Sequence, residues 1–122
     1  MRAERYRELL GGMPGLLLPM EPIWARMNWQ SYCVRLPDDC DQREVMQAML
    51  DSGIGVRRGI MCAHREAAYK RFAPRTPLSQ SEHAQDRCIL LPLYPQMTVG
   101  EQHRVASVLA KACASQQQLR VA

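Results

Sequence analysis

Three segments of the chain carry apolar residues three or four positions apart, the spacing of one face of an α-helix. Gly11 follows the first segment and Gly53 the second, and glycine is common just past a helix C-terminus. Asp41 and Thr98 stand three residues before a glutamate, as in a capping box, at the start of the second and third segments. The sequence therefore predicts helices over residues 2–10, over residues 42–52 and from residue 99 onward.

The apolar positions also predict which side of each helix is buried. In the second helix the predicted buried face consists of Val45, Met46, Met49 and Leu50. In the last helix it consists of Val105, Val108, Leu109 and Ala112, and the chain from residue 115 to 122, with three consecutive glutamines, is expected to fray.

Extended segments are short. Apolar and polar residues alternate over residues 30–36, which predicts a half-buried strand, and the apolar runs 16–18 and 88–91 are bounded by proline. Residues 65–72 and 79–87 are expected to be short helices, the second begun by a capping box of Ser79 and Glu82. This mixture indicates an α+β fold, with a small, mainly antiparallel sheet covered by helices on one side.

The segment from Gly53 to Tyr69 contains the candidate site. It combines a glycine-interrupted strand, the adjacent residues Arg57 and Arg58, and a following turn that holds His64. Successive strand residues point to opposite faces, so only Arg58 shares a face with the apolar residues of this strand. An arginine on a buried face needs an anion or a hydrogen-bond acceptor, which could be a ligand.

Two alternatives stay open for this segment. Arg58 could instead pair with an acidic residue of its own domain, such as Glu66 or Glu82. His64 is suited to proton transfer or substrate contact, although a single histidine is more often structural. Gly55 and Gly59 leave the opposite face nearly bare, so that a ligand or another backbone segment can approach.

Length, charge and cysteine content exclude several classes of protein. The 122 residues fit one domain, and 14 arginines spread along the chain give a net charge of +4 without the basic cluster typical of nucleic-acid binding. No apolar run could span a membrane. Five irregularly spaced cysteines and no secretory signal predict a reducing, cytoplasmic setting, and Cys62 with His64 lacks the further ligands of a metal site.

A series of short motifs resembles one family. Most specific are the segment from residue 53 to 69 and the segment from residue 91 to 101. The full series, in chain order, is Arg2-x-x-Arg5-Tyr6-x-x-Leu9, Leu18-Pro19, Ser31-Tyr32, Gly53-Ile54-Gly55, His64 followed by Tyr69, Leu91-Pro92-Leu93-Tyr94-Pro95, and Thr98-x-x-Glu101. Over about residues 1–113 the chain resembles the C-terminal small domain of the DegT/DnrJ/StrS family of pyridoxal-phosphate-dependent sugar aminotransferases.

The resemblance implies a fold and a function. The fold is the small domain of fold-type I aminotransferases, here residues 1–114, and the complete enzyme moves an amino group, usually from glutamate, to a nucleotide-linked keto sugar. Such enzymes are homodimers, so we expect a homo-oligomer or a missing large domain as partner, with Arg57, Arg58 and His64 on the sugar-nucleotide side of the cleft. No catalytic residue is implied in this chain.

The chain departs from the family pattern at the cofactor. The domain that carries the Schiff-base lysine is missing from the matched region, and neither Lys70 nor Lys111 lies in the family's lysine motif. We therefore expect pyridoxal phosphate only in the complete enzyme and none bound to this chain. The alternative is a non-catalytic module that binds an anionic ligand or a protein through the arginine strand.

Overall fold

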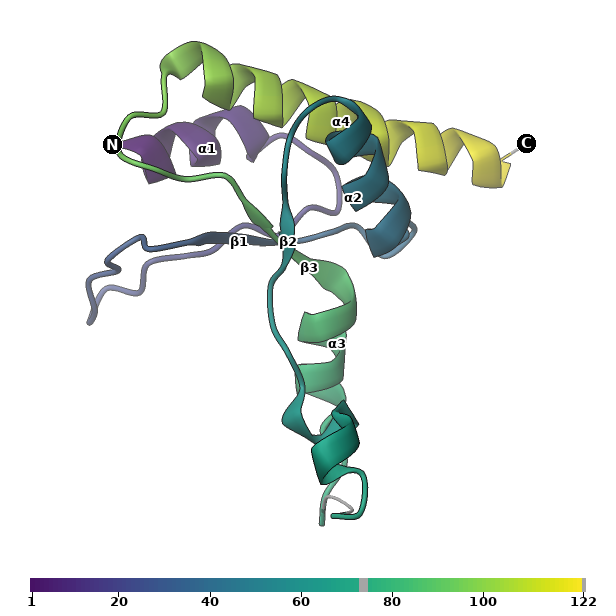
Figure 1. The fold of residues 1–122 in the computed structure, drawn as a ribbon. Helices are drawn as coiled ribbons and strands as arrows, with labels where there is room; N and C mark the ends of the chain where they lie inside the picture. Colours follow the sequence, from purple (N-terminus) through teal and green to yellow (C-terminus); the bar gives the residue numbers. More distant parts are fainter. Residues whose placement is uncertain (73–74, 122) are drawn as a thin grey trace.

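The computed structural model describes residues 1–72 and 75–121, with side chains as far as residue 119, and Figure 1 shows its fold. The order of elements in this part of the chain is α1 (Arg2–Leu10), β1 (Tyr32–Arg35), α2 (Gln42–Asp51), β2 (Arg57–Arg58), the 3-10 turns η1 (Ala63–Arg65) and η2 (Ala67–Tyr69), α3 (Ser79–Arg87), β3 (Cys88–Leu91) and α4 (Val99–Val121).

The three strands form one antiparallel sheet in the order β1-β3-β2. In this sheet β3 is central and pairs Ile89 with Val34 of β1 and with Arg58 of β2. Residues directly opposite each other in an antiparallel pair lie on the same face of the sheet. The buried residues Val34 and Ile89 therefore mark the core face, and the sequence-based expectation of a small antiparallel sheet in an α+β fold is confirmed.

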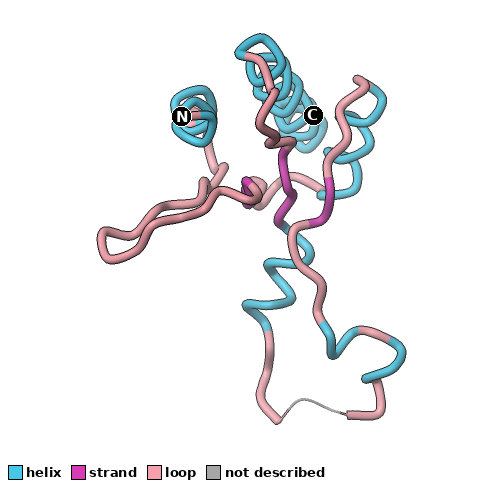
Figure 2. Tube along the Cα trace, turned by 60° about the vertical axis from the view of Figure 1, so that its left-hand side comes forward, coloured by secondary structure: helices cyan, strands magenta, loops and turns pink. Residues whose placement is uncertain are grey.

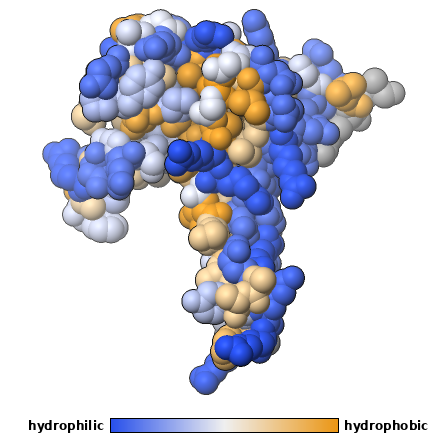
Figure 3. Space-filling view, in the orientation of Figure 1, coloured by the Kyte–Doolittle hydropathy of each residue, from blue (hydrophilic) through white to orange (hydrophobic). Residues whose placement is uncertain are grey.

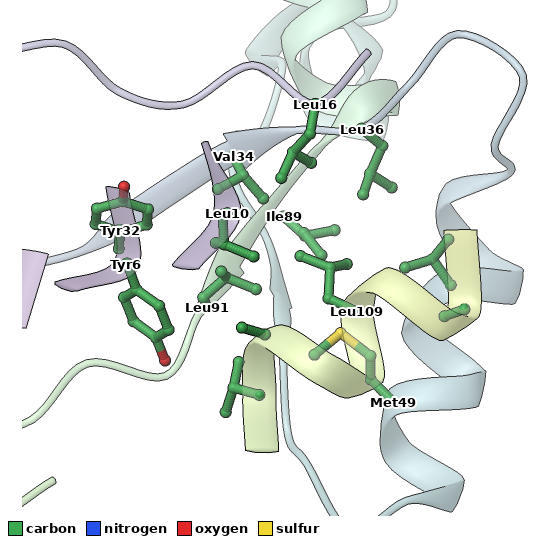
Figure 4. Close-up of a cluster of buried hydrophobic side chains, with 14 of the residues drawn as sticks. Tyr6, Leu10, Leu16, Tyr32, Val34, Leu36, Met49, Ile89, Leu91 and Leu109 are labelled. Atoms are coloured by element: carbon green, nitrogen blue, oxygen red, sulfur yellow. The ribbon is translucent and has the colours of Figure 1, made fainter. Parts of the chain in front are cut away.

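Helices α1, α2 and α4 cover the core face of the sheet. Figure 4 shows their apolar side chains meeting those of the strands, with Leu109 of α4 beside Ile89 and Met49 of α2. Tyr6 of α1 is fully buried, and its hydroxyl donates to the carbonyl oxygen of Pro92 at 2.7 Å, which fastens α1 to the chain after β3. The core of the molecule therefore lies between one face of the sheet and one layer of helices.

The N-caps predicted at Asp41 and Thr98 form, but the reciprocal bond of a full capping box forms only at Thr98. The Asp41 carboxylate accepts from the backbone N–H groups of Arg43 at 2.9 Å and Glu44 at 3.1 Å at the start of α2. At the start of α4, the Thr98 N–H donates to Glu101 and the Glu101 N–H donates to the Thr98 hydroxyl. These side chains satisfy N–H groups that no earlier helical turn could bond.

Four expectations are corrected. Residues 65–72 contain the end of η1 and the turn η2 in place of an α-helix, and residues 16–18 contribute only a bridge between Leu17 and Arg35. The box at Ser79 does not form, since α3 begins after Leu78 without a side-chain cap. The tail expected to fray from residue 115 is helical through Val121. Gln116 of this segment is buried and accepts from the backbone N–H of Asp41 at 2.6 Å.

Residues 59–72 and 75–87, which we call the arm, leave the sheet on the side away from α1, α2 and α4 (Figures 1 and 2). Only Cys62 and Gln85 are buried among the described residues of the arm. Large apolar side chains come to its surface, and Figure 3 shows hydrophobic colour along it. They are Ile60, Met61, Tyr69, Phe72 and Leu78.

A second exposed segment is the long loop between α1 and β1, in which Ile23 and Trp24 are almost entirely open to solvent. Trp29, near the end of this loop, is different, because it packs against the core and stacks on Tyr32 with ring centroids 5.8 Å apart. Within the described residues, no helix has the length and apolar character needed to cross a membrane.

Candidate functional site

The strand β2 places the two arginines on opposite faces of the sheet. Arg58 lies opposite Ile89, on the core face, while Arg57 lies opposite Leu90 on the face that the helices leave open. The alternation rule therefore predicted the face of Arg58 correctly. Because β2 is an edge strand only two residues long, the Arg58 side chain reaches the rim of the core, where its exposed fraction is 44%.

Arg58 is held by residues of its own domain. Its Nε donates to Oε1 of Gln42 at 3.1 Å, and an NH2 nitrogen lies 3.6 Å from Oδ1 of Asp86. Arg58 therefore pairs with an acidic residue of its own domain, as one of the two alternatives held. That residue is Asp86, and neither Glu66 nor Glu82. The side chain of Arg57, in contrast, is exposed and has no hydrogen bond or ion pair to any described residue.

His64 lies in η1 on the arm, with its side chain only 16% exposed. Its Nε2 is 2.9 Å from Oε1 of Glu82, so a proton on Nε2 is donated to that carboxylate. His64 also borders an apolar cavity of about 420 Å³ whose lining includes Ile60, Tyr69 and Phe72. The structure does not bring His64 into contact with Arg57 or Arg58, and it joins His64 to Arg58 only through other side chains.

Charged side chains connect the parts of this site. Arg65 donates from NH1 to Asp86 at 2.7 Å and to Gln85 at 3.1 Å, and its Nε lies 3.7 Å from Glu82. Asp86 therefore faces Arg58 on one side and Arg65 on the other. Sequence reasoning missed Asp86, Gln85 and Gln42, because α3 and α2 meet the arginine strand only in three dimensions.

Ion pairing lowers the pKa of two carboxyl groups in this network. The hydrogen bond from Arg65, with the charges of Arg65 and Arg58, holds the pKa of Asp86 below its usual value. The hydrogen bond with His64, supported by the charge of Arg65, does the same for the pKa of Glu82. In both cases partial burial opposes the shift and is the smaller effect.

We predict that acid weakens the fold through Asp86. A carboxyl group whose pKa is lower in the folded chain contributes stability above its unfolded pKa and loses it as the pH falls through the folded value. The melting temperature should therefore fall as the pH drops below the ordinary aspartate pKa, and Asp86→Asn should reduce that fall. Melting curves at several pH values test this, with Glu44→Gln as a control at an exposed carboxylate outside the ion pairs. Equal pH dependence in all three proteins would contradict it.

The two glycines beside the arginines have different surroundings. A Cβ on Gly55 would meet nothing within 4 Å, which agrees with the expected bare face. A Cβ on Gly59 would lie 2.9 Å from Sγ of Cys33 and 3.2 Å from Cβ of Cys88, so at this position the close approach is made by the protein's own strands. Gly59 therefore belongs to the packing of the sheet.

Gly59→Ala is expected to lower the free energy of unfolding by about 1–3 kcal/mol, because the new methyl group overlaps Cys33 and Cys88. Gly55→Ala, which meets open space, should change it by less than about 1 kcal/mol. Urea unfolding of both variants measures the difference. Adding Cys33→Ala should restore part of the loss in Gly59→Ala, and equal effects of the two glycine substitutions would show that the overlap is not real.

Comparison with known proteins gives the family. Residues 1–110 match the DegT/DnrJ/EryC1/StrS aminotransferase family. The chain belongs to this family. The resemblance to this family is therefore confirmed, and the family depends on pyridoxal phosphate.

Solved structures agree on the fold. The crystal structure of DesI in the presence of its TDP-sugar product is similar with a TM-score of 0.84 at 24% identity, over 98% of this chain and 31% of that one. The aminotransferase TlmJ from Streptoalloteichus hindustanus gives 0.83 at 22% identity, over 95% and 31%. PseC from Helicobacter pylori, an aminotransferase involved in the biosynthesis of pseudoaminic acid, gives 0.83 at 14% identity, over 93% and 31%. The chain thus spans about a third of the length of these proteins.

The residues of this chain do not fit a pyridoxal phosphate site. Such a site needs a lysine held in a pocket beside the cofactor. Lys70 is exposed on the arm, and Lys111 is exposed on α4. Neither lines the cavity beside His64, so no chemistry of the cofactor is assigned to the described residues of this chain.

Proposed function

We propose that this chain is the C-terminal domain of a pyridoxal-phosphate-dependent nucleotide-sugar aminotransferase. The complete enzyme would move an amino group from an amino acid such as glutamate to a keto sugar carried on a nucleotide. The family match over residues 1–110 carries the proposal. The presence of a TDP-sugar product in the structure of DesI supports the choice of a nucleotide sugar as substrate.

The chain would be inactive alone and would bind no cofactor. Its fold accounts for about 31% of the length of DesI, and both of its lysines are exposed, so the cofactor lysine must come from the remaining part of the enzyme. We further propose that this part, or a second subunit, covers the arm and the loop that carries Trp24, and that the enzyme works in the cytoplasm. Exposed large apolar side chains on both segments support such a partner.

Arg57, Arg58 and His64 would serve the substrate in different ways. Of these three side chains, Arg57 is the cation without a partner among the described residues, and beside it Gly55 leaves room for a close approach, so Arg57 would contact the diphosphate of the nucleotide sugar. Arg58 is bound to Gln42 and Asp86, and His64 is paired with Glu82. These two residues would shape the edge of the substrate site and contact the sugar nucleotide from there.

Cofactor spectroscopy on this chain alone tests the proposal. With stoichiometric pyridoxal phosphate and excess glutamate, we expect no absorbance band at about 400 nm that borohydride removes, and no conversion of glutamate, because no lysine lies in a pocket. Addition of the lysine-bearing domain of a complete relative serves as the positive control. A borohydride-sensitive band with this chain alone, abolished by Lys70→Ala or Lys111→Ala, would overturn the proposal.

A further inference from the structure

One buried side chain, Gln42, joins the arm to the core. Gln42 is the first residue of α2 and is 5% exposed. Its Nε2 donates to the carbonyl oxygens of Gln85 at 2.8 Å and Cys88 at 2.7 Å, where α3 passes into β3. Its Oε1 accepts from Nε of Arg58 at 3.1 Å. Both donors and the acceptor of this amide are therefore used.

These three bonds hold both ends of the arm at once. Arg58 ends β2, where the chain enters the arm, and Gln85 and Cys88 mark where the chain returns from it. The hydrogen bonds within the sheet here are few, because β2 pairs only two residues with β3. The contacts of Gln42 thus add to a short strand pairing at the base of the arm.

Ion pairs and hydrogen bonds extend the contacts of Gln42 into the arm. Arg58 lies beside Asp86, and Asp86 accepts from Arg65, which also bonds the side chain of Gln85. Arg65 in turn lies 3.7 Å from Glu82, the partner of His64. An unbroken series of polar contacts therefore runs from α2 in the core to His64 on the arm.

We propose that Gln42 is a positioning residue, which sets the direction of the arm and thereby the place of His64. The effect of this positioning on a nucleotide sugar rests on the proposed function. The geometric claim does not, because it concerns only the chain as described. A carboxylate at residue 42 could still accept from Arg58, but it could not donate to the two carbonyl oxygens.

The test measures the arm directly, in the full 122-residue chain. Spin labels are placed by unnatural amino acids at His83 on α3 and Lys111 on α4, both exposed, because the five cysteines exclude thiol labelling. Double electron–electron resonance then gives the distance distribution between arm and core. Gln42→Met and Gln42→Glu are both expected to widen it roughly twofold, since a hinge that has lost its contacts samples more angles.

Gln102→Met is the matched control. Gln102 is fully buried, and it accepts from Arg5 and donates to the carbonyl oxygen of Arg2, which joins α1 to α4 far from the arm. Its replacement should lower the melting temperature and leave the distance distribution unchanged. If Gln42→Met does not fold, Gln42→Glu decides.

Three results would overturn the proposal: an unchanged width in the folded Gln42 variants, an equal widening in Gln102→Met, or failure of both Gln42 variants to fold. Because no substrate is used, a widened distribution in a chain that fails every nucleotide-sugar assay would support the role of Gln42 and refute only the proposed function.

Discussion

Arg57→Ala is expected to raise the KM for a nucleotide sugar about tenfold, which corresponds to about 1.4 kcal/mol of binding free energy, with little change in melting temperature. The Arg57 side chain is exposed and bonds to no described residue, so its removal breaks no side-chain hydrogen bond or ion pair of the fold. The assay needs a complete enzyme, and a hybrid in which this chain replaces the matching 31% of DesI provides one.

Arg58→Ala is the matched comparison in the same hybrid. Its loss leaves Gln42 and Asp86 without their contacts to Arg58, so a lower melting temperature is expected. Strand alternation alone had favoured Arg58 for direct substrate contact. Because Arg58 is bound to Gln42 and Asp86, we now favour Arg57 for that contact. A KM effect of Arg58→Ala at unchanged melting temperature, together with no KM effect of Arg57→Ala, would restore the original assignment.

Leu109→Ala is expected to lower the free energy of unfolding by about 2–5 kcal/mol. Leu109 is fully buried and lies between the sheet and helix α2, where Figure 4 shows it beside Ile89 and Met49. A truncated side chain would leave a cavity that these neighbours cannot fill. A loss of this size is a large share of the roughly 5–15 kcal/mol that stabilises an ordinary domain, and denaturant titration measures it.

Leu50→Ala is the control for this prediction. Leu50 was expected on the buried face of α2, yet it is 59% exposed, so its truncation should cost about 0.5 kcal/mol or less. If the two leucine variants unfold at the same denaturant concentration, the packing of α4 against the sheet is not as described.

Local patterns predicted the features that depend on neighbouring residues in the sequence. The caps at Asp41 and Thr98 form because a side-chain oxygen can reach the N–H groups two and three residues ahead. Strand alternation placed Arg58 on the core face, because the side chains of successive strand residues point to opposite faces of the sheet. The mixture of short strands and helices indicated the α+β class, which the three-stranded antiparallel sheet and its helices confirm.

Contacts between distant segments were not predictable in this way. Asp86 and Gln42 are 28 and 16 residues from Arg58, and no periodicity relates them to it. Gln116 looked like part of a frayed polar tail, yet it is buried because the backbone of Asp41 offers it partners. Leu50 lies at the edge of its apolar stripe, and only the placement of α2 decides that it is exposed.

The most direct test of the account is amino transfer from glutamate to a nucleotide-linked keto sugar. It compares the hybrid enzyme, the lysine-bearing part of DesI alone, and this chain alone, after absorbance has shown that the hybrid holds its cofactor. We predict transfer by the hybrid only. Transfer by this chain alone, or no transfer by a folded hybrid that holds its cofactor, would contradict the assignment of this chain as the C-terminal domain of such an enzyme.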